Sequence, residues 1–386
     1  MELLNNLLLG LQVASDPTIL WYCFFGVFLG TAVGVLPGIG ALAAISLLLP
    51  MTYHMSPTAA IVMLAGVYYG AQYGGSTASI LMNLPGGPAA AVTCLDGYPM
   101  AKNGKAGIAL FITTIASLFG AMFGLVLLVL FSPAIAEVGL KFGPAELFSM
   151  MVMGLVAASS MGSGSPIKGL SMVVMGVLLG MVGTDVNSGA ARFTLDIPEL
   201  MDGINLVALA MGLFGVSEVV RGIHGQDDTQ KVEPMTLRSM IPSKQEMKRS
   251  YPAMFRGSVL GSALGALPGV GPSIAAFMAY AVEKKTAKNP QEFGHGAVQG
   301  ISAPESANNA AAQTAFVPSL SLGIPGDAVM AIMLGALIIH GIQPGPMLIN
   351  EQPEMFWGLV VSFAIGNIML VLLNIPTIGI WVSLLR

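Results

Sequence analysis

The chain has 386 residues, of which 54% are hydrophobic and only 9% are charged. A soluble domain carries about 25% charged residues, so this composition excludes an ordinary water-soluble domain and indicates an integral membrane protein. The formal net charge of −4 comes from few groups, and no basic patch of the kind that binds nucleic acid is evident.

Apolar stretches of membrane length follow one another along the chain. They begin after residues 1–13, which lack the basic residues of a cleavable signal peptide. We expect membrane spans, each about 17–25 residues long, at 18–36, 58–82, 106–132, 145–161, 167–184, 203–220, 252–267, 300–322 and 355–373. Apolar segments that are too short to span comfortably lie at 38–50, 269–283 and 326–341.

One glycine- and proline-rich motif occurs twice. Residues 30–40 read GTAVGVLPGIG and residues 261–271 read GSALGALPGVG, with identity at seven of eleven positions. Two looser matches follow in the same order, NLPG with GIPG (83–86 and 323–326) and DGYPM with HG and PM (96–100, 340–341 and 346–347). The conserved order of the three blocks predicts an internal duplication.

The distribution of lysine and arginine predicts how the two copies are oriented in the membrane. The flanks of the first motif, 1–17 and 50–57, contain neither residue type. The second motif is flanked on both sides by Lys244, Lys248, Arg249, Lys284, Lys285 and Lys288. Because cytoplasmic loops carry an excess of positive charge, we expect inverted repeats whose motifs face opposite sides of the membrane.

The sequence therefore predicts an all-α integral membrane protein with about 9–10 transmembrane helices and two re-entrant, broken-helix hairpins. A polar segment divides it, so we expect a first membrane half at 1–220, a cytoplasmic linker at 221–251 and a second membrane half at 252–386. The second copy is followed by fewer residues than the first, and we expect this half to be incomplete.

The turns LPGIG (36–40) and LPGVG (267–271) form the first candidate site. Proline removes a backbone donor and glycine frees the backbone, so both helices should be interrupted there. A single such break is often a simple kink. Secondary transporters, however, use paired broken helices to bind anionic groups at helix N-termini. We expect substrate contacts from Pro37, Gly38, Gly40, Asn83, Pro268, Gly269, Gly271 and Asn309.

Small polar side chains form the second candidate site. The segments YGGSTAS (73–79) and ESANN (305–309) each follow the broken motif of their own half. Hydroxyl, amide and carboxylate oxygens suit Na⁺, although ordinary packing of membrane helices uses the same residue types. We expect a site for a coupling cation at Ser76, Thr77, Asn308 and Glu305.

Three acidic residues near the motifs have two interpretations each. Glu305 and Asp327 follow proline or glycine, and either residue could carry a coupling ion or cap the start of a helix. Pro304 is expected to break the helix just before Glu305. Asp96, within LDGYP, could likewise be functional, but we expect it to be a structural turn residue.

Catalytic motifs are not evident. The four histidines, at positions 54, 224, 295 and 340, are scattered, and the two cysteines lie in apolar surroundings. We expect no enzyme and no cofactor, with Na⁺ or H⁺ serving only as the coupling ion.

Four longer blocks carry a specific resemblance to a known family. They read LPGIGALAAISLLLP, YYGAQYGGSTASILMNLPGGPAAAVTCLDGYPMAKNGKAG, APESANNAAAQTAFVPSLSLGIPGD and HGIQPGPML. These blocks are similar to those of the large membrane subunit of tripartite tricarboxylate transporters, the TctA family, and the similarity covers essentially the whole chain. Members of that family are usually longer than this chain.

The resemblance implies a multi-pass permease of the bacterial inner membrane that imports citrate or another carboxylate by cation coupling. It also implies two partners, a small four-helix membrane subunit and a periplasmic solute-binding protein. A passive channel or facilitator for small organic anions is the alternative.

The arginines all fall at expected span ends or in loops: Arg192, Arg221, Arg238, Arg249, Arg256 and Arg386. Helix N-termini, hydroxyls, amides and bound cations would then compensate the substrate charge.

Overall fold

The computed structural model describes residues 2–36, 40–141, 165–184 and 240–384, with short stretches and single residues between 143 and 220. The regular elements among these residues are helices, apart from a two-stranded antiparallel ribbon formed by β1 (Gly183–Thr184) and β2 (Ala191–Arg192). The prediction of an all-α membrane protein is confirmed.

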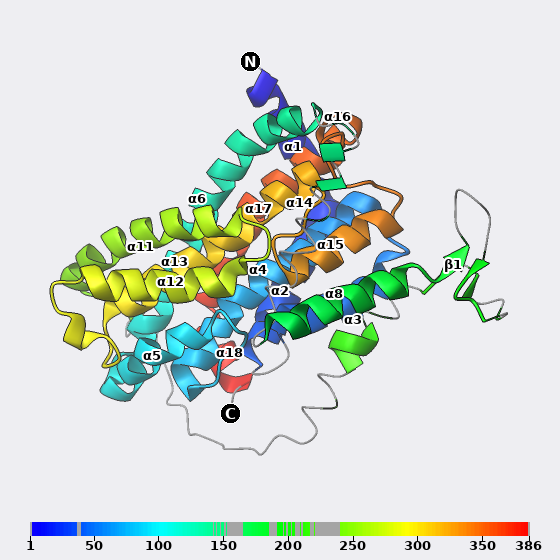
Figure 1. Cartoon of the computed structure of the whole chain (residues 1–386). Coiled ribbons are helices and arrows are strands. Elements are labelled where there is room, and N and C mark those ends of the chain that lie inside the picture. Colours follow the sequence, from blue (N-terminus) through cyan, green and yellow to red (C-terminus); the bar gives the residue numbers. More distant parts are fainter. Residues whose placement is uncertain are drawn as a thin grey trace.

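The helices before residue 220 run from the blue N-terminus to the green segment of Figure 1. They are α1 (Glu2–Ala14), α2 (Pro17–Val35), α3 (Gly40–Thr52), α4 (Pro57–Met82), α5 (Ala91–Met100), the π-helical turn η1 (Ala101–Lys105), α6 (Ala106–Gly139), α8 (Pro166–Gly180) and the π-helical turn η3 (Met211–Val216).

The helices after residue 240 run from yellow-green to red (Figure 1). They are α11 (Lys244–Gly265), α12 (Gly271–Thr286), the 3₁₀ turn η5 (Pro290–Glu292), α13 (Val298–Thr314), α14 (Phe316–Leu322), α15 (Ala328–Ile339), α16 (Leu348–Glu351), α17 (Pro353–Asn374) and α18 (Ile378–Leu384).

Most expected spans coincide with these helices, whereas 145–161 and 203–220 fall largely outside the described residues. Within the described part, α2, the segment Ala91–Gly139 (kinked at η1) and α17 are long and apolar enough to cross a membrane. The total number of crossings stays a prediction.

The end of the expected linker, 244–251, forms the first part of α11. Ser243 and Glu246 form a reciprocal capping box that starts α11 at Lys244. The cap helps this polar stretch to join the helix, because side chains satisfy the backbone donors of Ser243 and Glu246.

The two halves use the same helix packing. A Cβ atom placed on the glycines of α2 would lie 2.3–2.5 Å from a carbonyl oxygen of α4, at Gly26, Gly30 and Gly34. On α11 it would lie 2.2–2.4 Å from a carbonyl oxygen of α13, at the corresponding Gly257, Gly261 and Gly265. Small residues permit this close backbone approach between membrane helices. The opposite orientation of the repeats stays a prediction.

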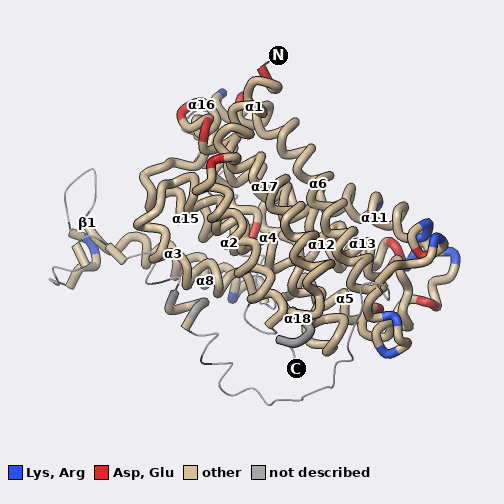
Figure 2. The backbone as a smooth tube through the Cα atoms, turned by 180° about the vertical axis from the view of Figure 1, so that it is seen from behind, with Lys and Arg blue, Asp and Glu red and all other residues tan. Residues whose placement is uncertain are grey.

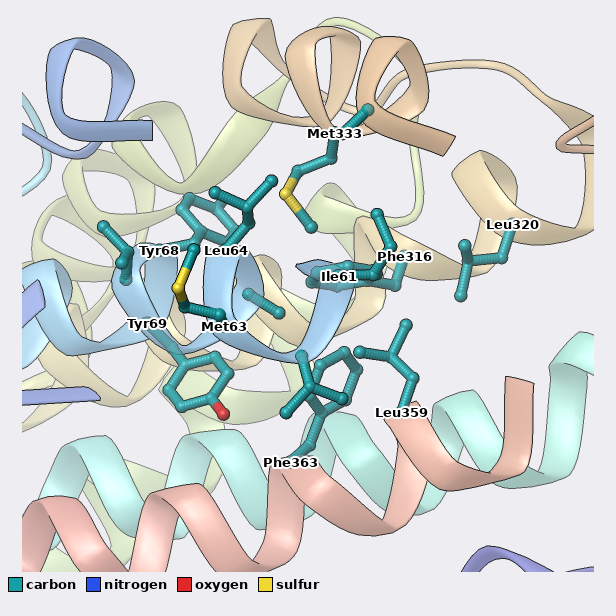
Figure 3. Packing of buried hydrophobic residues seen from close by; sticks show 14 of the residues in the cluster. Ile61, Met63, Leu64, Tyr68, Tyr69, Phe316, Leu320, Met333, Leu359 and Phe363 are labelled. Atoms are coloured by element: carbon teal, nitrogen blue, oxygen red, sulfur yellow. The ribbon is translucent and has the colours of Figure 1, made fainter. Parts of the chain in front are cut away.

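An aromatic cluster lies within the larger hydrophobic core (Figure 3). Phe316 of α14 and Phe363 of α17 have ring centroids 4.7 Å apart, and Tyr69 of α4 meets Phe363 edge-on at 5.8 Å. All three side chains are buried. Since α4 and α13 are covered on almost every side, their polar residues face protein rather than lipid.

Charged residues gather where α11 begins and α12 ends (Figure 2). The ion pairs there are Arg249–Glu292, Arg256–Glu283 and Lys105–Glu246. This end of the molecule therefore has the polar surface expected at a boundary between membrane and water.

Candidate functional site

Glu305 lies in the middle of α13, and the expected helix break at Pro304 is wrong. The helix runs from Val298 to Thr314 with Pro304 inside it. One missing donor is tolerated in a buried membrane helix, because neighbouring helices support the freed carbonyl. Glu305 is therefore not at a helix start, and a capping role does not explain it.

The Glu305 carboxylate accepts hydrogen bonds from three helices of the first half. Ser76 of α4 donates to Oε1 at 2.7 Å and Thr93 of α5 donates to the same oxygen at 2.5 Å. Ser117 of α6 donates to Oε2 at 3.3 Å. With only 1% of its surface exposed, Glu305 joins the two halves of the chain in their interior.

Hydroxyl groups are the only partners of this carboxylate among the described residues. The ion pairs of the described part involve other acidic residues, at the charged end of α11 and α12. A buried carboxylate without a positive partner is costly, and a proton or a cation relieves that cost. The oxygens of the Glu305 carboxylate and of the three hydroxyl groups are hard ligands that suit a cation.

Three amide side chains on the same helix are also buried, Asn308, Asn309 and Gln313. Asn309 donates from Nδ2 to the backbone oxygen of Glu305 at 3.0 Å. Among the described residues, both polar atoms of Asn308, Oδ1 of Asn309 and Oε1 of Gln313 have no hydrogen-bond partner. Buried polar atoms are rarely left unpaired, so these amides are candidates for ligand contacts.

The structure thus brings two of the four expected cation-binding residues together, Ser76 and Glu305. Thr77 is buried beside Ser76 on α4, and Asn308 is buried one turn beyond Glu305 on α13. Whether these residues bind a cation stays a prediction.

Sequence reasoning missed Thr93 and Ser117. Both are hydroxyl residues in helices, where such residues commonly bond to their own backbone. Their separation from Glu305, 212 and 188 residues, leaves no local pattern that could have shown the contact.

The first broken turn lies partly outside the described residues, since Pro37 and Gly38 are not among them. Gly40 opens α3 with a left-handed φ of 64°. The loop after α4 packs against the end of α2, where a Cβ atom on Gly86 would lie 2.1 Å from the carbonyl oxygen of Gly34. Only glycine permits this approach.

In the second broken turn, Gly269 donates its backbone N–H to the carbonyl oxygen of Gly326 at 3.0 Å. Gly271 opens α12 with a φ of 67°, and a Cβ atom on it would lie 3.2 Å from Cβ of Asp327. Pro268 precedes these glycines in the turn between α11 and α12. In each half, therefore, the broken turn meets the second repeated block.

Asn83 ends α4 in the left-handed conformation, with a φ of 58°. The corresponding residue of the second half, Gly323, ends α14 with a φ of 71°. Asparagine tolerates this conformation better than most residues. The backbone conformation alone therefore explains why an asparagine stands here, and no ligand contact is needed to explain it. Its expected substrate contact stays a prediction.

Asp327 caps the start of α15, as one of its two interpretations expected. Its Oδ1 accepts from the backbone of Met330 at 2.8 Å, and its Oδ2 accepts from the Tyr68 hydroxyl at 2.5 Å. This buried carboxyl group lies beside Gly271. A negative charge therefore adjoins the second broken turn unless it is neutralised.

Asp96 lies inside α5, so the expected turn at LDGYP is wrong. Pro99 is tolerated near the end of this short helix, and the chain then bends at Asn103 and Gly104 in η1, where Gly104 has a φ of 73°, before α6 begins. Asp96 is fully buried.

A cavity of about 470 Å³ opens in another part of the described structure. It lies between α1, the start of α4 and the start of α17, and its lining includes Asp16 and Glu354. None of the expected site residues lines it.

The fold and the site together define a class, an all-α membrane protein with duplicated helix packing and a buried polar centre. The tripartite tricarboxylate transporter TctA family model matches residues 20–386. The chain therefore belongs to this family.

Two relatives from Agrobacterium vitis are similar to the chain. An uncharacterized 52.8 kDa protein in the TAR-I ttuC' 3' region is 49% identical over 385 residues, which cover 100% of this chain and 76% of the relative. An uncharacterized protein in the TAR-II ttuC' 3' region is 58% identical over 125 residues, which cover 32% of this chain and 52% of the relative. No solved structure matches the chain.

Proposed function

We propose that the chain is the permease subunit of a cation-coupled importer of citrate or another carboxylate in the bacterial inner membrane. Membership of a family of tricarboxylate transporter subunits supports the substrate class. The tripartite family also supports two partners, a small membrane subunit and a periplasmic solute-binding protein that delivers the substrate.

The main support for cation coupling is the Glu305 carboxylate, which is buried without a positive partner in the described structure. One monovalent cation balances its single charge. A Na⁺ ion would be coordinated by oxygens of Glu305 and Ser76, and also of Thr77 and Asn308. A proton would instead reside on Glu305 itself.

The substrate would bind at the broken turns, where the N-termini of α3 and α12 offer backbone donors. The two turns are not equivalent. Asp327 adjoins the second turn, whereas a Cβ atom on Gly87, the corresponding residue after the NLPG block, would meet nothing within 4 Å. The first turn therefore suits the anion better, with Asn309 as an additional polar contact.

Substitution of Glu305 tests the coupling in proteoliposomes that also contain the partner subunits and a binding protein. Wild-type uptake of a radiolabelled carboxylate should be saturable and should need an inward Na⁺ or H⁺ gradient. Glu305→Gln keeps the size of the side chain and removes its charge, so uptake should lose its dependence on the gradient.

Two milder variants, Ser76→Ala and Asn308→Ala, should raise the Na⁺ concentration required for half-maximal uptake. If both leave Na⁺-dependent uptake unchanged, the assignment of these residues is wrong. Uptake by the wild type that needs no gradient would favour the passive facilitator instead.

A further inference from the structure

Asp96 connects the two halves of the chain through three backbone hydrogen bonds. Its Oδ1 accepts from the N–H groups of Gly294, Gly296 and Ala297, each at 2.8 Å. Asp96 lies on α5 in the first half, whereas its donors form the loop that leads into α13 in the second half. Bonds from neutral donors to a carboxylate are charge-assisted and stronger than bonds between neutral groups.

The loop is shaped for this carboxylate. Gly294 and Gly296 have φ angles of 90° and 106°, a region that favours glycine, and this backbone directs three N–H groups of one short loop to one oxygen. Space is also reserved at Gly300, where a Cβ atom would lie 2.0 Å from Oδ2 of Asp96. Gly294, Gly296 and Gly300 therefore all contribute to the contact between Asp96 and the loop before α13.

The same short helix reaches the Glu305 site. Thr93 and Asp96 are three residues apart and thus share one face of α5. Thr93 donates to Glu305 in the middle of α13, while Asp96 holds the residues that begin α13. Two points on α5 consequently hold α13 against the first half, in addition to the contact of α13 with Ser117 of α6.

We propose that Asp96 is a positioning residue for the Glu305 site. By holding the start of α13 against α5, it sets the distance between the Thr93 hydroxyl and the Glu305 carboxylate. This role rests on the proposed coupling of a cation at Glu305, and Asp96 itself does not contact the ion.

Asp96→Ala and Asp96→Asn form the first test, measured as the Na⁺ concentration for half-maximal carboxylate uptake by the reconstituted complex. Asp96→Ala should raise this concentration about tenfold, the size seen when the supporting partner of a ligand is removed. Asp96→Asn keeps an acceptor oxygen and should have a smaller effect. Asp16→Asn is the matched control, since Asp16 also accepts from backbone N–H groups but caps the distant α2.

Hydrogen exchange of the purified protein tests how firmly α13 is held and needs no transport assay. Asp96→Ala should accelerate exchange both in residues 294–297 and in the part of α13 around Glu305. Acceleration at 294–297 alone, with an unchanged Na⁺ requirement, would mean that Asp96 only orders its loop, and the proposal would be overturned.

Gly300→Ala supplies an independent variant, because its Cβ would displace the Asp96 carboxylate. In the wild-type background it should raise the Na⁺ requirement as Asp96→Ala does. In the Asp96→Ala background it should add little, since the group that it displaces is already gone. Additive effects would contradict the proposal.

The proposed function can fail separately. If wild-type uptake shows no cation dependence, coupling at Glu305 is wrong, and hydrogen exchange then decides the positioning role alone. Faster exchange around Glu305 in Asp96→Ala would support that role, and unchanged exchange there would overturn it.

Discussion

Individual residues at the centre of this protein act across long separations in sequence. Ser76, Thr93 and Ser117 meet Glu305 from 229, 212 and 188 residues away. The polar segments that follow each broken motif predict Ser76 and Glu305 as cation ligands. The sequence does not predict the other two hydroxyls, since many hydroxyl residues occur in apolar helices and only tertiary contacts distinguish among them.

At this scale, Thr93→Val should raise the Na⁺ concentration for half-maximal uptake about tenfold, because it removes one hydroxyl from the Glu305 carboxylate while conserving shape. Thr113→Val is the matched control. Thr113 is equally buried, but its hydroxyl bonds only to carbonyl oxygens of its own helix. If both variants raise the Na⁺ concentration equally, the loss of any buried hydroxyl has this effect, and the role of Thr93 at the Glu305 site is contradicted.

A second residue-scale prediction concerns pH outside the membrane-spanning helices. The Arg249 guanidinium, and then Asn289, hydrogen-bond to Glu292 and lower the pKa of its carboxyl group below the usual 4.5. The stabilisation is therefore present above that pH and is lost as the pH falls through the lowered pKa. Because the pair is partly exposed, we expect at most about 1 kcal/mol.

Thermal unfolding in detergent checks this prediction by comparison of wild type with Glu292→Gln. The variant should be slightly less stable at pH 7, and the difference should vanish in acid. A difference that persists at pH values well below 4.5 would contradict the ionic origin.

Elements repeat more faithfully than individual residues do. The motifs at 30–40 and 261–271 predicted a duplication, and the described helices reproduce it as equivalent glycine contacts between α2 and α4 and between α11 and α13. Two local expectations are wrong: the helix break at Pro304 and the turn at Asp96. At Pro304, burial of the helix outweighs one lost hydrogen bond.

Glycine-to-alanine substitutions test this packing. Gly30→Ala and Gly261→Ala each force a methyl group against a backbone carbonyl and should destabilise the protein by about 1–3 kcal/mol. Gly176→Ala on α8, where nothing lies within 4 Å, is the control and should have little effect. Melting temperatures in one detergent give the comparison, and equal values for all three variants would contradict the shared interface.

For the whole molecule, the distribution of charge predicts that the two broken hairpins face opposite sides of the membrane. Single cysteines at the exposed positions Tyr53 and Thr286, which follow or end α3 and α12, should react with an impermeant thiol reagent from opposite faces. The background protein would carry serine in place of Cys23 and Cys94. Reaction of both sites from one face would exclude inverted repeats.

The sequence by itself determined that the chain is an all-α membrane protein, that its two broken motifs are related and that it resembles the TctA family. These properties depend on hydrophobicity, local backbone chemistry and repeated order, all of which are written along the chain. Only the tertiary structure decided that Glu305 lies among three hydroxyls and that Asp96 holds the loop before α13. Those contacts join the two halves, and no local pattern encodes which side chains meet when helices from separate halves pack together.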